Sequence, residues 1–329
     1  MAGPDLALEQ SEATAVFDRL AERELVIVSG KGGVGRTTLS AVIGLALAER
    51  GRRTLIATTG HDDRLAWMLG RSELPDTATR VGSRLYVQRL VPHVCLREYG
   101  TLVVRSARVA SAVFDNRVVR RLAHAIPGLD DFAVLGKAWH EAARGGDFDT
   151  VIFDGPATGH LLYTVGLPHA ILAAIPPGPL TREAELMRSA LTDPARTEAV
   201  LVGLPEAWPL TELAELGASL KSRLQIGAST IIVNGLWPSG LTGLSPSASA
   251  TPEVVAMARY LESIAAVGER HRQEVETWAS SEAAAKLEAS TIMPVPWVWD
   301  GLAEPHAVRE LLASLEGVAS VRHSATHES

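Results

Sequence analysis

The chain has 329 residues, of which 47% are hydrophobic and 21% charged, so it can bury the core of one large α/β domain or of a domain with an insertion. Its net charge of −7 and its pI near 5.8 argue against a nucleic-acid partner. The single cysteine, Cys95, excludes an internal disulfide and a cysteine-rich metal site. No stretch reaches the roughly 18 apolar residues of a membrane span. The acidic N-terminus lacks a signal pattern, so we predict a cytoplasmic chain without stable membrane insertion.

A weak helical pattern over residues 5–22 leads to an apolar run at 25–29, which is short and β-branched like a buried strand. A helix with an apolar surface is expected at 39–50. Strand, loop and helix in this order are the setting of a phosphate-binding loop, because glycines let backbone N–H groups turn inward and the helix N-terminus is positive. We therefore predict that ATP binds the residues between them, which are Gly30, Lys31, Gly32, Gly33, Val34, Gly35, Arg36, Thr37 and Thr38.

This loop departs from the usual G-x-x-x-x-G-K-[ST] pattern at two positions. Arg36 replaces the usual lysine, and Lys31 follows the first glycine, as in the deviant form K-G-G-x-G-K-[ST]. With this loop the chain resembles the ArsA family of P-loop ATPases, which includes the arsenical pump-driving ATPase and the Get-pathway ATPase that escorts tail-anchored proteins. The resemblance implies that Lys31 reaches the nucleotide of a partner across a dimer interface. Lys31 and Arg36 are thus the candidate catalytic cations, and a solvated loop lysine is the alternative for Lys31.

A second strand is expected at residues 52–58, and the first switch of the resembled family follows it. That switch carries an aspartate that orients the attacking water. Alignment without gaps over residues 64–70 places this aspartate at Gly60. Asp62 and Asp63 lie close by but out of register, and we favour a solvated or helix-capping pair over rescue of the lost role. Arg36 and Gly60 together predict impaired ATP hydrolysis.

A strand at 84–90 precedes a mostly helical insertion at about 91–145. Apolar residues and arginines interleave over 97–124. This pattern fits a groove for a partner or apolar cargo, and it also fits an amphipathic helix docked on the domain, which we favour. The insertion contains no methionine and therefore lacks the Met-rich cargo surface of the tail-anchor escorts.

Residues 150–154 form an apolar run that ends in Asp154. A carboxylate at the tip of a strand beside the loop can hold Mg²⁺ opposite the Thr37 hydroxyl, so Thr37 and Asp154 are the predicted metal ligands. Asp154 and the Thr-Gly-His run at 158–160 match the second switch of the family, D-x-A-P-T-G-H. The resemblance implies that Gly159 senses the γ-phosphate, while His160 is interpreted as a packing or hinge residue.

The C-terminal part predicts further alternation of helices and strands. A strand at 229–234 ends in Asn234, whose amide can meet the edge of adenine or simply close a turn, and the resemblance favours adenine. Trp297 and Trp299 are able to stack on the base, although we favour packing roles for both. The remaining expected elements are a helix at 180–193, a strand at 198–203, helices at 210–224 and 253–288, a mobile loop at 235–252, a strand at 292–296 and a helix at 305–316.

The alternation predicts an α/β fold, a P-loop NTPase with a mostly parallel sheet, helices on both faces and a helical insertion. We expect one ATPase domain over residues 1–316 and a disordered tail at 317–329. The resemblance implies a nucleotide-dependent dimer, either a homodimer or a heterodimer with an ArsA-like paralogue, coupled to a protein partner or tail-anchored cargo. Two alternatives stay open, a non-hydrolysing nucleotide-sensing adaptor paired with an active paralogue and a positioning ATPase of the MinD/ParA type. The tail lacks the basic character that the latter needs.

Overall fold

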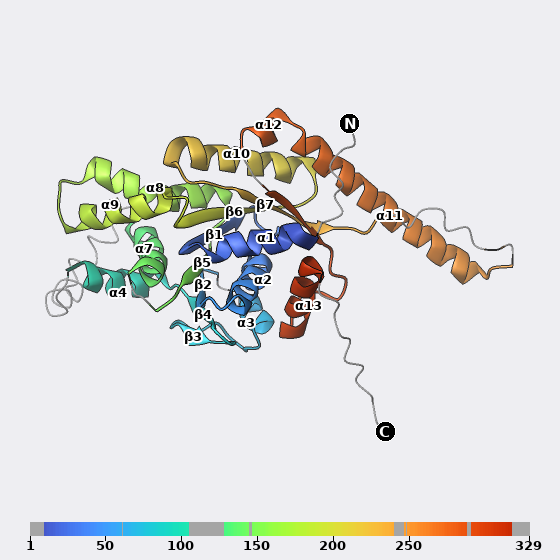
Figure 1. The fold of residues 1–329 in the computed structure, drawn as a ribbon, viewed down its shortest axis with the longest axis horizontal. Coiled ribbons are helices and arrows are strands. Elements are labelled where there is room, and N and C mark those ends of the chain that lie inside the picture. Colours follow the sequence, from blue (N-terminus) through green and yellow to red (C-terminus); the bar gives the residue numbers. More distant parts are fainter. Residues whose placement is uncertain are drawn as a thin grey trace, which may run out of the picture.

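A computed structural model describes residues 10–60, 62–104, 128–144, 147–239, 247, 249–287 and 291–317. Its centre is an eight-stranded sheet in the order β3-β4-β2-β5-β1-β6-β7-β8, parallel except where β3 pairs with β4 (Figure 1). This confirms the predicted P-loop NTPase fold. The strands are β1 (Leu25–Gly30), β2 (Thr54–Thr58), β3 (Thr79–Arg80), β4 (Leu85–Arg89), β5 (Thr150–Asp154), β6 (Thr197–Gly203), β7 (Thr230–Leu236) and β8 (Thr291–Pro296).

Helices cover both faces of the sheet (Figure 1). One face carries α1 (Gln10–Ala21), α2 (Arg36–Glu49), α3 (Arg64–Met68) and α13 (Pro305–Glu316). The other carries α7 (Leu129–Ala143), α8 (Thr158–Ala174), α9 (Pro179–Thr192) and α10 (Ala207–Leu224), with α4 (Pro92–Val104) against α7 and with α11 (Pro252–Ala279) and α12 (Glu282–Ala285) against α10. Alternate residues of β1 enter the two cores, since Ile27 packs on one face and Val28 on the other. This is the pattern of a central parallel strand.

Strand pairing places the two predicted phosphate motifs side by side. β1 lies between β5 and β6, and Val28 pairs in register with Asp154. Because the strands are parallel, the loop after β1 and the carboxylate at the end of β5 leave the sheet at the same edge. Ligands of open α/β sheets bind at this carboxyl edge.

Two features of the fold differ from the sequence prediction. The long helix expected at 253–288 is wrong as a single element, because α11 ends at Ala279 and Ser281 caps α12 by accepting the N–H of Ala284 at 3.2 Å. The sequence prediction also lacks α8. Its apolar residues lie on all sides of the helix, so the sequence shows no helical periodicity there. Most of the amphipathic stretch at 97–124 and nearly all of the expected tail lie outside the described residues.

The 28-residue helix α11 is anchored along only part of its length. From Ile264 onward it is packed on the body, through Ile264, Val275 and Trp278, whereas the part before Ile264 extends beyond the rest of the described chain (Figure 1). Met257 and Tyr260 on that projecting part are 57% and 58% exposed. Among the described residues, no helix combines the length and the apolar character that crossing a membrane requires.

Candidate functional site

The glycine loop between β1 and α2 has the backbone geometry of an anion site. Gly35, the N-cap of α2, has a φ of 93°, and a Cβ there would lie 2.2 Å from Nδ2 of Asn234. A Cβ on Gly30 would lie 2.1 Å from the carbonyl oxygen of Val202 on β6. Both positions therefore require glycine. No side chain caps α2, so the N–H groups of its first turn remain available for a phosphate.

Asp154 is the buried acidic group of the site, with only 5% of its surface exposed. Its carboxylate accepts hydrogen bonds from the hydroxyls of Thr37 at 2.9 Å, Thr58 at 2.9 Å and Ser40 at 3.3 Å. Burial raises the pKa of Asp154, and these hydroxyls together with the charge of Arg36 oppose that rise. The predicted metal pair, Thr37 and Asp154, is thus in direct contact.

This donor set suits Mg²⁺ rather than a metal held by the protein alone. A hydroxyl and one carboxylate are hard oxygen ligands, and Mg²⁺ commonly combines one or two carboxylates with phosphate oxygens and water. Within the described ranges there is no cluster of three or more His, Cys, Asp or Glu residues that could hold a metal. Thr37 and Asp154 fit an ion that a bound phosphate helps to hold.

Arg36 connects the loop to the segment after β5. Its Nη1 donates a hydrogen bond to the carbonyl oxygen of Gly155, and Ser29 donates to the carbonyl oxygen of Pro156 at 3.0 Å. The guanidinium is therefore bound to the second switch segment. Gly159 lies in the first turn of α8, which has no side-chain cap, and no atom lies within 4 Å of the position of a Cβ on Gly159. This leaves open space beside that turn.

Lys31 makes its contacts outside the loop. Its Nζ lies 3.0 Å from Oε2 and 3.1 Å from Oε1 of Glu212 on α10. The indole N–H of Trp208 donates to the same Oε1 at 2.9 Å, and Trp208 is 68% exposed. Lys31, Glu212 and Trp208 thus form a polar group at the surface next to the loop.

Gly60 offers only its backbone, whose N–H donates to the Thr58 hydroxyl at 3.0 Å. The neighbouring carboxylates, those of Asp62 and Asp63, bind backbone N–H groups and an arginine nearby. Asp62 accepts the N–H of Arg64 at 2.9 Å, and Asp63 accepts the N–H of Leu74 at 3.1 Å and pairs with Arg89 at 2.8 Å.

Asn234 near the end of β7 is hydrogen-bonded to the glycine loop. Its Nδ2 donates to the carbonyl oxygen of Val34 at 2.8 Å. It also lines a cavity of about 480 Å³ together with Thr38, Trp297 and Trp299. The two tryptophans pack on Trp237, with ring centroids 6.1 and 5.4 Å away, and stay 46% and 53% exposed. Both therefore pack within an aromatic cluster and also offer exposed ring surface to the cavity.

Comparison with known proteins agrees with this geometry. The model of the anion-transporting ATPase family, ArsA_ATPase, matches residues 23–175, which contain the glycine loop, Asp154 and Gly159. The predicted resemblance to the ArsA family is therefore confirmed over these residues.

Three relatives illustrate the range of the family. An arsenical pump-driving ATPase of Escherichia coli is 29% identical over 63% of this chain and 34% of its own length. An arsenical pump-driving ATPase of Acidiphilium multivorum is 27% identical over 64% of this chain and 39% of its own. The ATPase BagA of Mycobacterium tuberculosis is 25% identical over 72% of both chains. The chain thus spans little more than a third of the length of the pump-driving relatives.

Three residues of this site were not found by sequence reasoning. Ser40 lies one helical turn after Thr37, so the i, i+3 spacing on α2 is a signal that could have placed it beside Asp154. Thr58 reaches Asp154 because β2 pairs with β5, which requires the strand order. Glu212 has no local signal, because the contact to Lys31 spans 181 residues.

Proposed function

We propose that this chain binds ATP with Mg²⁺ at Gly30–Thr38 and acts as a nucleotide-dependent dimer switch coupled to a protein partner, with impaired hydrolysis. Residues 1–316 would form one ATPase domain. The observation that carries the proposal is the contact between the Thr37 hydroxyl and the Asp154 carboxylate at the N-terminus of α2. It joins the two phosphate motifs of an ArsA-family chain at one point.

In the proposed complex, the loop amides and the start of α2 bind the phosphates. Thr37 and Asp154 hold Mg²⁺, which when bound offsets the charge of the phosphate oxygens. Asn234 then meets the adenine edge in the cavity that it lines with Trp297. To do so, its amide exchanges the hydrogen bond to Val34 for one to the base. The γ-phosphate would then occupy the open space beside Gly159 in the first turn of α8.

The proposed impairment of hydrolysis rests on two positions of the chain. Arg36 has a planar, bulky guanidinium where the family has a compact ammonium, and here it is bound to Gly155. Gly60 has no side chain to orient a water, and the carboxylates of Asp62 and Asp63 already bind other groups of the chain. Losing such transition-state interactions lowers the rate by orders of magnitude.

The same substitutions favour a second candidate function, a non-hydrolysing nucleotide-sensing adaptor that pairs with an active paralogue. Both candidates need a dimer, formed with a second copy or with an ArsA-like paralogue. Lys31 supports this, because it points to the surface next to the 68% exposed Trp208. Exposed tryptophans beside a charged group are common anchors of protein interfaces.

The pump-driving relatives are named for arsenicals, and we propose that this chain does not share that ligand. Its one cysteine, Cys95, is 2% exposed, and burial raises the pKa of its thiol to about 12. A buried thiol that stays protonated is a poor metal or metalloid ligand. This leaves a protein, for example tail-anchored cargo, as the proposed partner class.

Calorimetry with a non-hydrolysable ATP analogue and Mg²⁺ tests the nucleotide site. Saturable binding is expected for the wild type, and its loss in the double variant Thr37→Ala, Asp154→Ala. A matched control is Thr211→Ala with Asp147→Ala, which removes the same side chains from exposed positions. Absence of binding heat at millimolar analogue, for the chain alone and with a co-expressed paralogue, would refute the proposal.

A further inference from the structure

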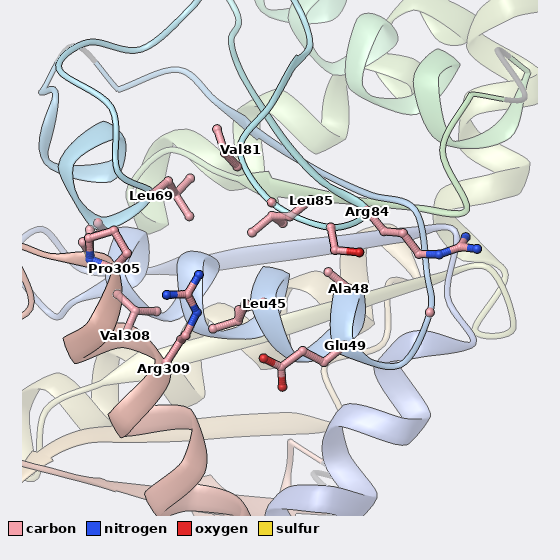
Figure 2. A pocket seen from close by; sticks show the side chains of 14 residues that line it. Leu45, Ala48, Glu49, Leu69, Val81, Arg84, Leu85, Pro305, Val308 and Arg309 are labelled. Atoms are coloured by element: carbon pink, nitrogen blue, oxygen red, sulfur yellow. The ribbon is translucent and has the colours of Figure 1, made fainter. Parts of the chain in front are cut away.

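A second cavity, of about 510 Å³, lies at the C-terminal end of α2, at the opposite end of that helix from the glycine loop (Figure 2). Four elements form it, namely α2, the end of α3, the turn between β3 and β4, and the start of α13. Its volume is in the range of small-molecule sites. Nothing in the proposed nucleotide chemistry uses this cavity.

The walls of this cavity are mostly apolar. Leu85 and Val308 belong to the buried core, whereas Leu45, Leu69 and Val81 are only partly buried because they face the open space. Figure 2 shows these side chains around the same open space. A ligand here would cover apolar surface that the fold leaves exposed to water, and this burial is the main source of affinity in such sites.

Two opposite charges stand at the edge of this apolar surface. Figure 2 shows the Glu49 carboxylate and the Arg309 guanidinium on either side of Leu45, while the Arg84 side chain extends away from them. Within the described part of the chain, neither the Glu49 nor the Arg309 side chain makes a hydrogen bond or a salt bridge, although their two charges attract each other. Partial burial raises the pKa of Glu49, helped by the charge of Glu316 and opposed by Arg309 and Arg50.

We propose that this cavity binds a small zwitterion with an apolar body, of the class of apolar α-amino acids. Its ammonium group would pair with Glu49, its carboxylate with Arg309, and its side chain would cover Leu45, Leu69 and Val81. A ligand with one charge would bury the other protein charge without a partner, and this is costly. A ligand with both charges satisfies Glu49 and Arg309 together.

The position of α3 links this cavity to the nucleotide side. Met68 lines both cavities, Leu69 lines only this one, and Arg64 and Trp67 line only the one beside Asn234. The short helix α3 is thus a shared wall, and it follows the first switch segment directly. We expect the zwitterion to change the affinity for nucleotide, and this part of the inference rests on the proposed function. The binding of the zwitterion itself does not.

Calorimetry on the nucleotide-free full chain tests the binding. L-Phenylalanine and L-leucine are the probes, with glycine as the zwitterion without an apolar body. Phenethylamine and 3-phenylpropionate each carry one of the two charges. We expect saturable binding of at least one apolar amino acid, and binding at least tenfold weaker for the three partial analogues, as for the loss of one charge-assisted interaction or of the apolar contact.

Variants then locate the site. Glu49→Gln and Arg309→Gln should each weaken the apolar amino acid about tenfold, and Leu45→Trp should block it by filling the cavity. Glu310→Gln, an exposed neighbour outside this cavity, should leave binding unchanged. No saturable binding at 10 mM by either amino acid, equal binding by a singly charged analogue, or insensitivity to Glu49→Gln and Arg309→Gln would each overturn the proposal. If the zwitterion binds but the chain has no affinity for nucleotide, the proposed binding site stands, whereas the proposed function and the coupling to nucleotide are refuted.

Discussion

Replacing Glu212 by glutamine should strengthen nucleotide-dependent dimerisation. In the free chain, Glu212 holds Lys31 at 3.0 Å and accepts the Trp208 indole at 2.9 Å. The proposed dimer needs Lys31 to reach the nucleotide of the partner, so this ion pair must break first. Glutamine keeps the shape and the acceptor for Trp208 but removes the charge that restrains Lys31.

The size of the effect follows from the exposure of the pair. The Lys31 side chain is 48% exposed and that of Glu212 30%, so water screens their attraction. Exposed pairs contribute about 0.2 to 1 kcal/mol, which corresponds to a 1.4- to fivefold rise in the population of free Lys31. A symmetric dimer uses two such lysines, so its dissociation constant should fall by a factor of about 2 to 25.

Analytical ultracentrifugation with a non-hydrolysable ATP analogue and Mg²⁺ measures this constant. Glu215→Gln, an exposed carboxylate one turn further along α10, is the matched control and should have no effect. Lys31→Met in the Glu212→Gln background should abolish the gain. Unchanged or weaker dimerisation of Glu212→Gln would refute the reasoning, because Lys31 would then not be the residue that the ion pair restrains.

Four further predictions concern the site and the core. Arg36→Lys with Gly60→Asp should raise steady-state phosphate release by more than the sum of the single changes. Wild-type turnover of about 1 per second or faster would contradict the prediction of impaired ATP hydrolysis. Gly35→Ala should lose analogue binding in a filter assay, because its φ is 93° and the new Cβ would meet Asn234; retained affinity would show that the loop adapts. Cys95 should resist maleimide in the native state at pH 8, since burial raises the pKa of its thiol to about 12, and rapid labelling measured by mass spectrometry would contradict this. Asp154→Asn should raise the melting temperature of the nucleotide-free chain, and the gain over wild type should grow as pH rises from 4 to 7. The reason is that the raised pKa of Asp154 makes its stabilising contribution fall as the group ionises; a gain that shrinks with rising pH would refute it.

The sequence was sufficient for features whose signals are local. The apolar run before Gly30, the glycine spacing and the strand ending in Asp154 each predict one element, and the parallel sheet then brings Thr37 to Asp154. The helix at 305–316 was also located to the residue, because Pro305 begins it and Gly317, with a φ of 72°, ends it.

Features that depend on distant residues could not be predicted in this way. The ion pair of Lys31 with Glu212 requires α10 to pack beside the loop, and the bond from Arg36 to Gly155 requires the pairing of β1 with β5. The break at Ser281 was missed because the residues on both sides of it favour a helix, and only the cap marks the boundary.

The partly anchored helix α11 acts as a lever. Twelve residues precede Ile264, the first buried residue of this helix, so about 18 Å of helix lies beyond the anchored part. A tilt of about 10° at the anchor would move the free end by about 3 Å, which is comparable to the length of a hydrogen bond. The anchored part carries His271, whose ring contacts Trp237 at 6.3 Å, and Trp237 packs on the tryptophans that line the cavity beside Asn234. A small rearrangement of those rings would therefore be amplified at the exposed end of α11.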